Sequence, residues 1–292
     1  MFQGPVVMRW YRAPAKLNLS LRVVGRREDG FHDLESLVAF ADVADWLGFA
    51  PGPSFELLVE GPGASETGPI GDNLVARAVR SLAARAPGLR SGAFRLVKRL
   101  PAAAGLGGGS SDAAACLRAL AEANGLGFDD ARVIAAASDT GSDVPVCMSA
   151  CARMMAGVGD RLGPPVRLPA LFAVLVNPRK AVATRDVFRA LGMEKGIYRD
   201  RRTPDQAVAA PTTLDALAAA GNDLEAPART VLPAIADILD RLRRLEGARL
   251  ARMSGSGATC FALFDDPGAA ATARGRLAAE EPGWWIAASA LG

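Results

Sequence analysis

The chain has 292 residues, half of them hydrophobic, and a formal net charge of +3 at pH 7. That length suits two domains or one large one, and the hydrophobic fraction is sufficient for a sizeable core. The small net charge argues against a nucleic-acid-binding protein. No apolar stretch reaches the length of a membrane span or of a secretory signal. We therefore expect a cytoplasmic protein with neither a membrane nor a nucleic-acid partner.

Four cysteines bear on the redox state: Cys116, Cys147, Cys151 and Cys260. Two of them, Cys147 and Cys151, are four residues apart, a spacing that could hold a metal, but no histidine or further cysteine stands near them. Buried, reduced thiols are the usual state in a cytosolic protein. We predict that state, and no metal site built by the protein alone.

In chain order, the first clear pattern is the alternation of apolar and polar side chains over residues 17–23. Such alternation predicts a half-buried strand, whose polar face begins with Lys16 and Asn18. Further strands are expected over residues 37–40, 55–60 and 94–100, and a helix over about residues 73–86.

The most distinctive segment, residues 101–113, reads PAAAGLGGGSSDA. Three consecutive glycines and two serines lead into an alanine-rich stretch with helical spacing. A glycine-rich turn with bare backbone N–H groups at a helix N-terminus is a ready site for phosphate. Ser110 or Ser111 is expected to cap the helix, with Asp112 in its first turn. The segment predicts a nucleotide-using enzyme; the alternative is an inert flexible loop.

Beyond this helix, another is expected near residues 129–137, then a turn at residues 141–145. The proline-rich residues 162–169 predict a domain boundary. After it we expect strands over residues 171–177, 249–253, 259–264 and 284–290, and helices over residues 232–245 and 269–279. Strands with helices on one side indicate an α+β sandwich.

Residues 252–258, RMSGSGA, form a second glycine-rich segment between two expected strands. On its own this segment is equally consistent with a hairpin turn. In a chain that also carries the first loop, we interpret it as a second part of a phosphate site.

Three polar residues are candidates for chemistry. Asp143, in the sequence GSDVP, is either a turn or cap residue, or a general base or charge organiser near a phosphate. Lys16 is either solvated or orients a carboxylate and a transferring phosphoryl group. His32 is the only histidine and follows Phe31 in a short loop after a glycine turn. It is either structural or able to reach a planar heterocycle.

Residues 101–114 resemble the phosphate-binding motif of the GHMP kinase superfamily, and residues 254–258 resemble its C-terminal glycine motif. Further motifs in residues 13–19, 29–32, 141–145 and 222–225 resemble one family within it. That family phosphorylates the 2-hydroxyl of 4-diphosphocytidyl-2-C-methyl-D-erythritol with ATP, in the non-mevalonate route to isoprenoid precursors.

The resemblance implies an α+β, two-domain GHMP kinase fold. An S5-domain-2-like N-terminal domain would span residues 1–165 and carry the ATP-binding loop and the catalytic residues. A ferredoxin-like α/β sandwich would span residues 166–292 and complete the substrate cleft. The partners it implies are ATP, Mg²⁺ and the cytidyl substrate, and the state we expect is a monomer or weak homodimer.

The resemblance also implies residue roles. Asp143 would accept the hydroxyl proton, Lys16 would pair with it, and Asn18 would lie near the same hydroxyl. ATP would be bound by Pro101, Gly105, Leu106, Gly107, Gly108, Gly109, Ser110 and Ser111, with Ser110 or Ser111 a contact to Mg²⁺. His32 would read the cytosine edge, Phe31 would stack on the base, and Thr184 and Phe188 would close the cytidine pocket. Arg185 departs from the proline frequent in the family, and residues 146–155 are also unlike common members.

Two other functions compete with this one. Another GHMP kinase, of the mevalonate or homoserine type, would have no use for Phe31 and His32 as base-reading residues, because its substrate has no base. A noncatalytic nucleotide-binding or RNA-binding protein on a similar fold would not need both Lys16 and Asp143.

Overall fold

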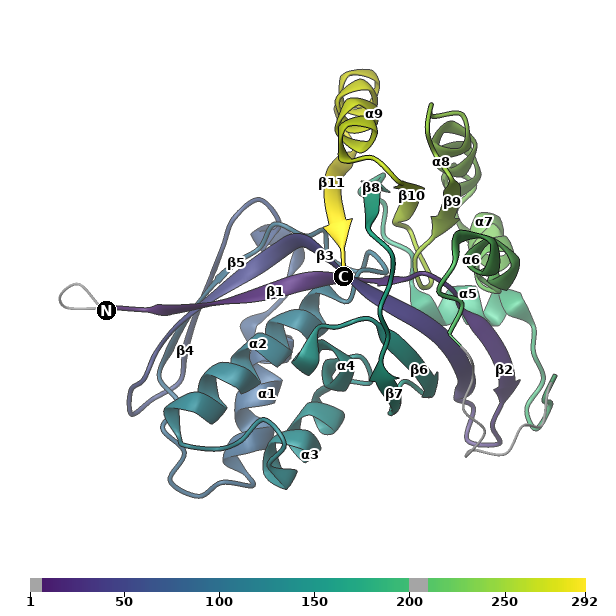
Figure 1. Cartoon of the computed structure of the whole chain (residues 1–292). Coiled ribbons are helices and arrows are strands. Elements are labelled where there is room, and N and C mark those ends of the chain that lie inside the picture. Colours follow the sequence, from purple (N-terminus) through teal and green to yellow (C-terminus); the bar gives the residue numbers. More distant parts are fainter. Residues whose placement is uncertain (1–6, 200–209) are drawn as a thin grey trace. The chain divides into compact units, whose positions relative to one another are not determined.

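The computed structural model describes residues 7–199 and 210–292, which form two compact units (Figure 1). Unit 1 consists of the described parts of Met1–Ala15, Ala44–Ala102 and Gly107–Ala150. Unit 2 consists of the described parts of Lys16–Val43, Ala103–Leu106 and Cys151–Gly292. The domain boundary expected at residue 165 stays a prediction.

Unit 1 combines a small sheet with helices. The end of β3 (His32–Ala50) pairs antiparallel with β5 (Ala93–Val97), which pairs parallel with β4 (Glu56–Glu60). The helices that pack on one another are α1 (Leu74–Ala83), α2 (Gly108–Ala123), α3 (Ala131–Thr140) and α4 (Val144–Ser149). Two short 3₁₀ turns, Ala64–Glu66 and Ile70–Asp72, precede α1. The strands expected at residues 55–60 and 94–100 are confirmed to within a few residues.

Side-chain caps define where α1 and α3 begin. Asn73 accepts a hydrogen bond from the Val75 amide at 2.9 Å, and Asp130 accepts one from the Arg132 amide at 2.9 Å. Helix α2 differs, because its N-cap is Gly107, with φ +61° and no side-chain cap. The expected serine cap is therefore wrong, and Asp112 lies beyond the first turn, which holds no acidic residue.

Unit 2 is built around β8 (Leu171–Asn177), which lies antiparallel between β10 (Cys260–Phe264) and β11 (Trp285–Leu291). Strand β9 (Leu250–Met253) pairs with β10, and α8 (Ala234–Arg243) and α9 (Pro267–Glu280) pack on these strands (Figure 1). The buried residues of α8, namely Ile235, Ile238, Leu239 and Leu242, recur at helical spacing. These six elements confirm the expected strands and helices of the C-terminal half.

The other elements of unit 2 were predicted less well. The first part of β3 pairs on one side with β2 (Arg22–Arg26) and on the other with β6 (Arg153–Gly157). Strand β6 also pairs with β7 (Arg161–Pro165). Strands β6 and β7 were not expected. Neither were three helices: α5 (Thr184–Leu191), α6 (Leu214–Ala220) and α7 (Glu225–Val231).

The single strand expected over residues 17–23 is wrong, because β1 (Arg9–Asn18) ends before β2 begins. At the break, side chains add to the backbone hydrogen bonds that Leu37 still accepts. Ser36 donates its hydroxyl hydrogen to the Ser20 carbonyl at 2.5 Å, and the Leu37 amide donates to Ser20 Oγ at 3.1 Å. The expected polar face is also buried, with Lys16 only 4% exposed.

All four cysteines are free thiols; Cys116, Cys147 and Cys260 are buried, as predicted, whereas Cys151 is only half-buried. Among the helices of the described residues, none has the length and apolar character needed to cross a bilayer.

Candidate active site

Two glycine-rich loops meet in unit 2. Gly105 has φ +73°, and a Cβ added there would lie 2.4 Å from the carbonyl oxygen of Ser254. The Ser254 hydroxyl donates to the Gly105 carbonyl at 2.9 Å and accepts from the Asn18 amide at 3.1 Å. The Lys16 amide donates to the Leu106 carbonyl at 2.8 Å. The absence of a side chain at Gly105 therefore lets the backbones of the two loops approach each other.

Asn222 shapes the second loop. Its amide nitrogen donates to the carbonyls of Met253 and Gly255 at 2.8 and 2.9 Å, and its side-chain oxygen accepts from the Leu224 amide at 2.9 Å. Glu225 accepts from the Met253 amide at 3.2 Å. The sequence motif at residues 222–225 therefore acts as a brace for the loop.

In unit 1, the N-terminus of α2 offers backbone donors. The Ser111 amide bonds to the Gly107 carbonyl at 2.8 Å, so the amides ahead of it have no carbonyl within the helix to bond. With the helix dipole, such amides attract an anion. Gly108 does not have a positive φ, and a Cβ added there would make only ordinary contacts at 3.5 Å or more. Its position therefore does not require glycine. The positions that need glycine are Gly105 and Gly107, both with positive φ.

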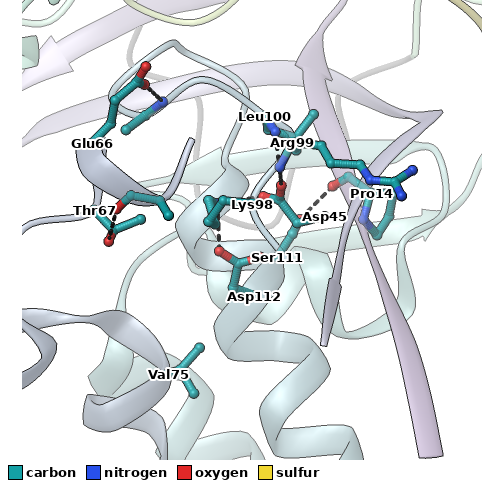
Figure 2. Close-up of polar contacts among 12 residues, drawn as sticks. Pro14, Asp45, Glu66, Thr67, Val75, Lys98, Arg99, Leu100, Ser111 and Asp112 are labelled. Atoms are coloured by element: carbon teal, nitrogen blue, oxygen red, sulfur yellow. Dashed lines mark hydrogen bonds and ion pairs between the residues drawn. The ribbon is translucent and has the colours of Figure 1, made fainter. Parts of the chain in front are cut away.

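The two serines of the loop differ. Ser111 is buried, and its hydroxyl donates to the Pro14 carbonyl at 2.7 Å (Figure 2). The same hydroxyl lies 3.3 Å from Cys147 Sγ. Ser110 is half-buried. Because a serine hydroxyl has one hydrogen to donate, Ser111 is used to hold the start of the chain, whereas Ser110 lies on the more open side of the helix.

A buried charge cluster supports this helix, and sequence reasoning missed it. Lys98 donates to Asp45 and, at 2.7 Å, to Asp112 Oδ2 (Figure 2). Asp45 Oδ1 also accepts from the amides of Arg99 and Leu100 at 2.5 and 2.9 Å. All three charged side chains are at most 4% exposed. The one signal in the sequence was a lysine that directly follows an apolar strand.

The charge cluster contains two carboxylates, Asp45 and Asp112, and only one cation, Lys98. Burial raises the pKa of Asp112 to about 7, although Lys98 opposes the shift. Burial alone would lower the pKa of Lys98, but Asp112 and Asp45 outweigh it and the pKa is raised. Asp112 Oδ1 is buried without a hydrogen-bond partner. A proton on Asp112 would leave one carboxylate facing one ammonium, the neutral arrangement that a buried site favours.

The two expected catalytic residues lie in different units. Asp143 is the N-cap residue of α4 in unit 1, and its side chain makes no capping hydrogen bond, so the simple cap interpretation fails. Lys16 is buried near the end of β1 in unit 2. Their pairing stays a prediction.

The structure brings His32 and Phe188 together. Their rings stack with centroids 4.4 Å apart and an interplanar angle of 23°. Burial, and then the charge of Arg26, lowers the pKa of His32, so the imidazole is neutral near pH 7. Its Nε2 atom is buried without a partner. Phe31, by contrast, is 63% exposed. The histidine thus combines a packed face with an unused polar edge.

The turn before His32, where β3 begins, is held by neighbours that sequence reasoning missed. Arg27 forms a bidentate pair with Asp33, with its shortest contact at 2.6 Å, and the Tyr198 hydroxyl donates to Asp33 at 3.1 Å. The Phe31 amide donates to Asp29 Oδ1 at 3.0 Å, a local turn that brings the chain back into β3.

Asn18 and Thr184 both lie beside the second glycine loop. The Thr184 hydroxyl is 2.9 Å from the Ser256 hydroxyl, and Asn18 Nδ2 donates to Ser36 Oγ at 2.7 Å. A Cβ at Gly255 would lie 3.2 Å from Asn18 Oδ1, so this oxygen faces the loop. Within unit 2 the structure therefore gathers two of the expected substrate residues around one loop.

Two family models match the chain: "GHMP kinases N terminal domain" at residues 73–150 and "GHMP kinases C terminal" at residues 208–282. The fold also resembles a solved homoserine kinase from Cytophaga hutchinsonii, with a TM-score of 0.66 at 17% identity over 99% of this chain and 96% of that one. The fold and the two glycine loops thus define a GHMP kinase, and the expected fold class is confirmed.

Nearer relatives narrow the family. A 4-diphosphocytidyl-2-C-methyl-D-erythritol kinase from Methylorubrum extorquens is 57% identical over 94% of this chain and 96% of its own. A second such kinase, from Methylobacterium radiotolerans, is 58% identical over 96% of this chain and 98% of its own. A crystal structure of a 4-(cytidine 5'-diphospho)-2C-methyl-D-erythritol kinase matches with a TM-score of 0.76 at 36% identity, over 97% and 99%. The chain belongs to the family of 4-diphosphocytidyl-2-C-methyl-D-erythritol kinases.

Proposed function

We propose that this chain transfers the γ-phosphoryl group of ATP to the 2-hydroxyl of 4-diphosphocytidyl-2-C-methyl-D-erythritol, within the non-mevalonate route to isoprenoid precursors. Beyond family membership, the assignment of a cytidyl substrate rests on His32. Its neutral ring stacks on Phe188, while its buried Nε2 has no hydrogen-bond partner. An unpartnered buried nitrogen is costly, and the edge of a cytosine would satisfy it. Phe31, exposed beside it, is available to stack on the base.

The phosphates of ATP bind at the N-terminus of α2. The amides of Gly108, Gly109 and Ser110 supply donors there, and the positive φ of Gly107 turns the chain into the helix. The backbone of Gly105 and Leu106 completes the loop, and Pro101 begins it. The second glycine loop, braced by Asn222, supports this backbone from the side of Gly105.

Asp143 accepts the hydroxyl proton as the substrate oxygen forms a bond to the γ-phosphorus and the bond to the β–γ bridging oxygen of ATP breaks. Lys16 pairs with Asp143, and Asn18 lies near the reacting hydroxyl. The transition state of phosphoryl transfer is loose, so positioning and charge stabilisation contribute more than the strength of the base.

Mg²⁺ fits the donors that the chain offers. Within residues 7–199 and 210–292 there is no cluster of three or more His, Cys, Asp or Glu side chains that could hold a metal ion. A kinase does not need such a cluster, because Mg²⁺ is held largely by nucleotide phosphates and water, with one or two protein oxygens. Ser110 is the hydroxyl we expect to contact it, since Ser111 is bonded to Pro14. The ion would neutralise phosphate charge.

A substrate panel tests this proposal. Release of ADP is measured with the purified protein and ATP against the cytidyl substrate, mevalonate and homoserine. We expect turnover with the cytidyl substrate alone, because the other two have no base for His32. Turnover of mevalonate or homoserine at a comparable kcat/KM would instead support another GHMP kinase. We further propose a cytoplasmic enzyme that acts on small molecules, as a monomer or weak homodimer.

A further inference from the structure

Arg118, on α2, binds three backbone carbonyls within unit 1. Its Nη1 atom donates to the carbonyls of Cys147 at 3.0 Å and of Met148 at 3.3 Å. Its Nη2 atom donates to the carbonyl of Arg12 in β1 at 2.6 Å. One guanidinium therefore joins the phosphate-loop helix, the short helix α4 and strand β1.

Helix α4 depends on such contacts. It has six residues, fewer than a helix needs to be stable alone, and it ends at Ala150 with φ +45°. The last carbonyls of a helix have no intrahelical partner, and a cation beside them is favourable. Arg118 supplies donors to two of these carbonyls, those of Cys147 and Met148, and a positive charge at the correct end.

The same helix carries Asp143 at its start. The Cys147 amide donates to the Asp143 carbonyl at 3.3 Å, which is the first hydrogen bond of the helix. Cys147 is fully buried, and its sulfur lies 3.3 Å from the Ser111 hydroxyl. Helix α2 therefore holds Cys147 at two points, through Ser111 and through Arg118, and Cys147 is bonded directly to the backbone of Asp143.

We propose that Arg118 is a positioning residue for phosphoryl transfer, which fixes α4 and thereby the direction of the Asp143 carboxylate relative to the phosphate-binding end of α2. This inference rests on the proposed function, in which Asp143 is the proton acceptor. Cys147 and Met148 are the points at which Arg118 holds the helix, through their backbone carbonyls.

The test uses Arg118→Met, which retains the aliphatic stem and removes the donors, and Arg118→Lys, which retains the charge but not the fork of donors. We expect Arg118→Met to lower kcat roughly tenfold or more, with the KM for ATP and for the cytidyl substrate within about twofold of wild type. Arg118→Lys should recover part of kcat. The matched control is Arg80→Met, because Arg80 also donates to a carbonyl, that of Gly71 at 2.9 Å, away from α4.

A double-mutant cycle with Asp143→Asn separates positioning from general stability. Arg118→Met should lower kcat in the wild-type background but change it less than about twofold in the Asp143→Asn background. Equal losses in both backgrounds, or an unchanged kcat in folded Arg118→Met, would overturn the inference while leaving the proposed function intact. If Asp143→Asn alone retains wild-type kcat, the proposed role of Asp143 fails first. Where Arg118→Met does not fold, Arg118→Lys enters the same cycle with the same criteria.

Discussion

The Lys98 ammonium lies 2.7 Å from Asp112 Oδ2, with both side chains almost fully buried. Asp45 binds the same ammonium and has two backbone amides as further donors, whereas Asp112 has one oxygen without a partner. Of the two carboxylates, Asp112 is therefore the one that burial favours in its protonated form, with a pKa of about 7. Asp112 lies in α2, about one turn from the helix N-terminus proposed to bind phosphate.

The raised pKa of Asp112 predicts a pH dependence of stability. In the unfolded chain its carboxyl ionises near pH 4, but the folded protein retains the proton up to about pH 7. The stabilisation is therefore fully present below about pH 4 and is lost as the pH rises through about 7. Asp112→Asn, which is neutral at every pH, should remove this contribution.

The measurement is urea unfolding of wild type and Asp112→Asn at pH 5.5 and 8.5. We expect the stability of the variant, relative to wild type, to increase between the lower and the higher pH. A relative stability that is the same at both values, or that falls at pH 8.5, would mean that Asp112 is ionised throughout. Asp139→Asn, on a carboxylate that is 54% exposed, is the control for a general loss of charge.

Gly105→Ala should separate the two glycine loops. Gly105 and Gly125 both have positive φ, but a Cβ at Gly105 would meet the Ser254 carbonyl at 2.4 Å, whereas nothing lies within 4 Å at Gly125. Gly125→Ala should cost only the backbone strain of about 1–2 kcal/mol. Gly105→Ala should cost more and also weaken ATP binding, as measured by denaturant unfolding and calorimetry. Equal stability and equal ATP affinity in the two variants would show that close approach of the loops is not needed.

His32→Ala should affect one substrate only. Loss of the imidazole removes the Nε2 atom proposed to pair with cytosine, so the KM for the cytidyl substrate should rise strongly while the KM for ATP stays nearly unchanged. Phe31→Ala should act in the same direction but more mildly, because stacking on one base contributes about 1–3 kcal/mol. Steady-state kinetics with each substrate varied in turn decide the matter. Equal effects on both KM values would make His32 structural.

Asp143→Asn should bind ATP normally and lose turnover. The amide is nearly isosteric but cannot accept the hydroxyl proton, and loss of a positioned base costs roughly a hundredfold or more. Calorimetry gives the ATP affinity, and single-turnover kinetics give the rate of phosphoryl transfer. A folded variant with near-wild-type transfer would exclude Asp143 as the base.

Regular periodicity predicted the strands β8 to β11 and the helices α8 and α9 of the C-terminal half, but not α5, α6 or α7. Strand β8 matches the expected residues 171–177, and the apolar face of α8 shows the helical spacing of its buried residues. The prediction failed where tertiary contacts override the pattern. In β3, which is 19 residues long, only residues 37–40 looked like a strand, because Asp42 and Asp45 interrupt the apolar run. Asp45 is buried there against Lys98, a partner far away in sequence.

The candidate site also has features that the sequence pattern predicted and features that depend on tertiary contacts. Glycine spacing indicated both loops, and their contact through Gly105 and Ser254 agrees with that reading. The hydrogen-bond partners of the side chains could not be predicted from spacing. Ser111 bonds to Pro14 instead of capping its helix, and Arg118 donates to the carbonyls of Cys147 and Met148. Each of these contacts joins segments that only the fold brings together.

The proposed reaction transfers the γ-phosphoryl group of ATP to one hydroxyl of a cytidyl substrate. Its most direct test incubates the purified protein with ATP labelled in the γ-phosphate and with 4-diphosphocytidyl-2-C-methyl-D-erythritol. We predict that the label appears in the cytidyl product as a phosphomonoester on the 2-hydroxyl, in equal amount to the ADP formed, as determined by chromatography and ³¹P NMR. Label released only as inorganic phosphate, or found on another hydroxyl, would show that the chain does not carry out this transfer.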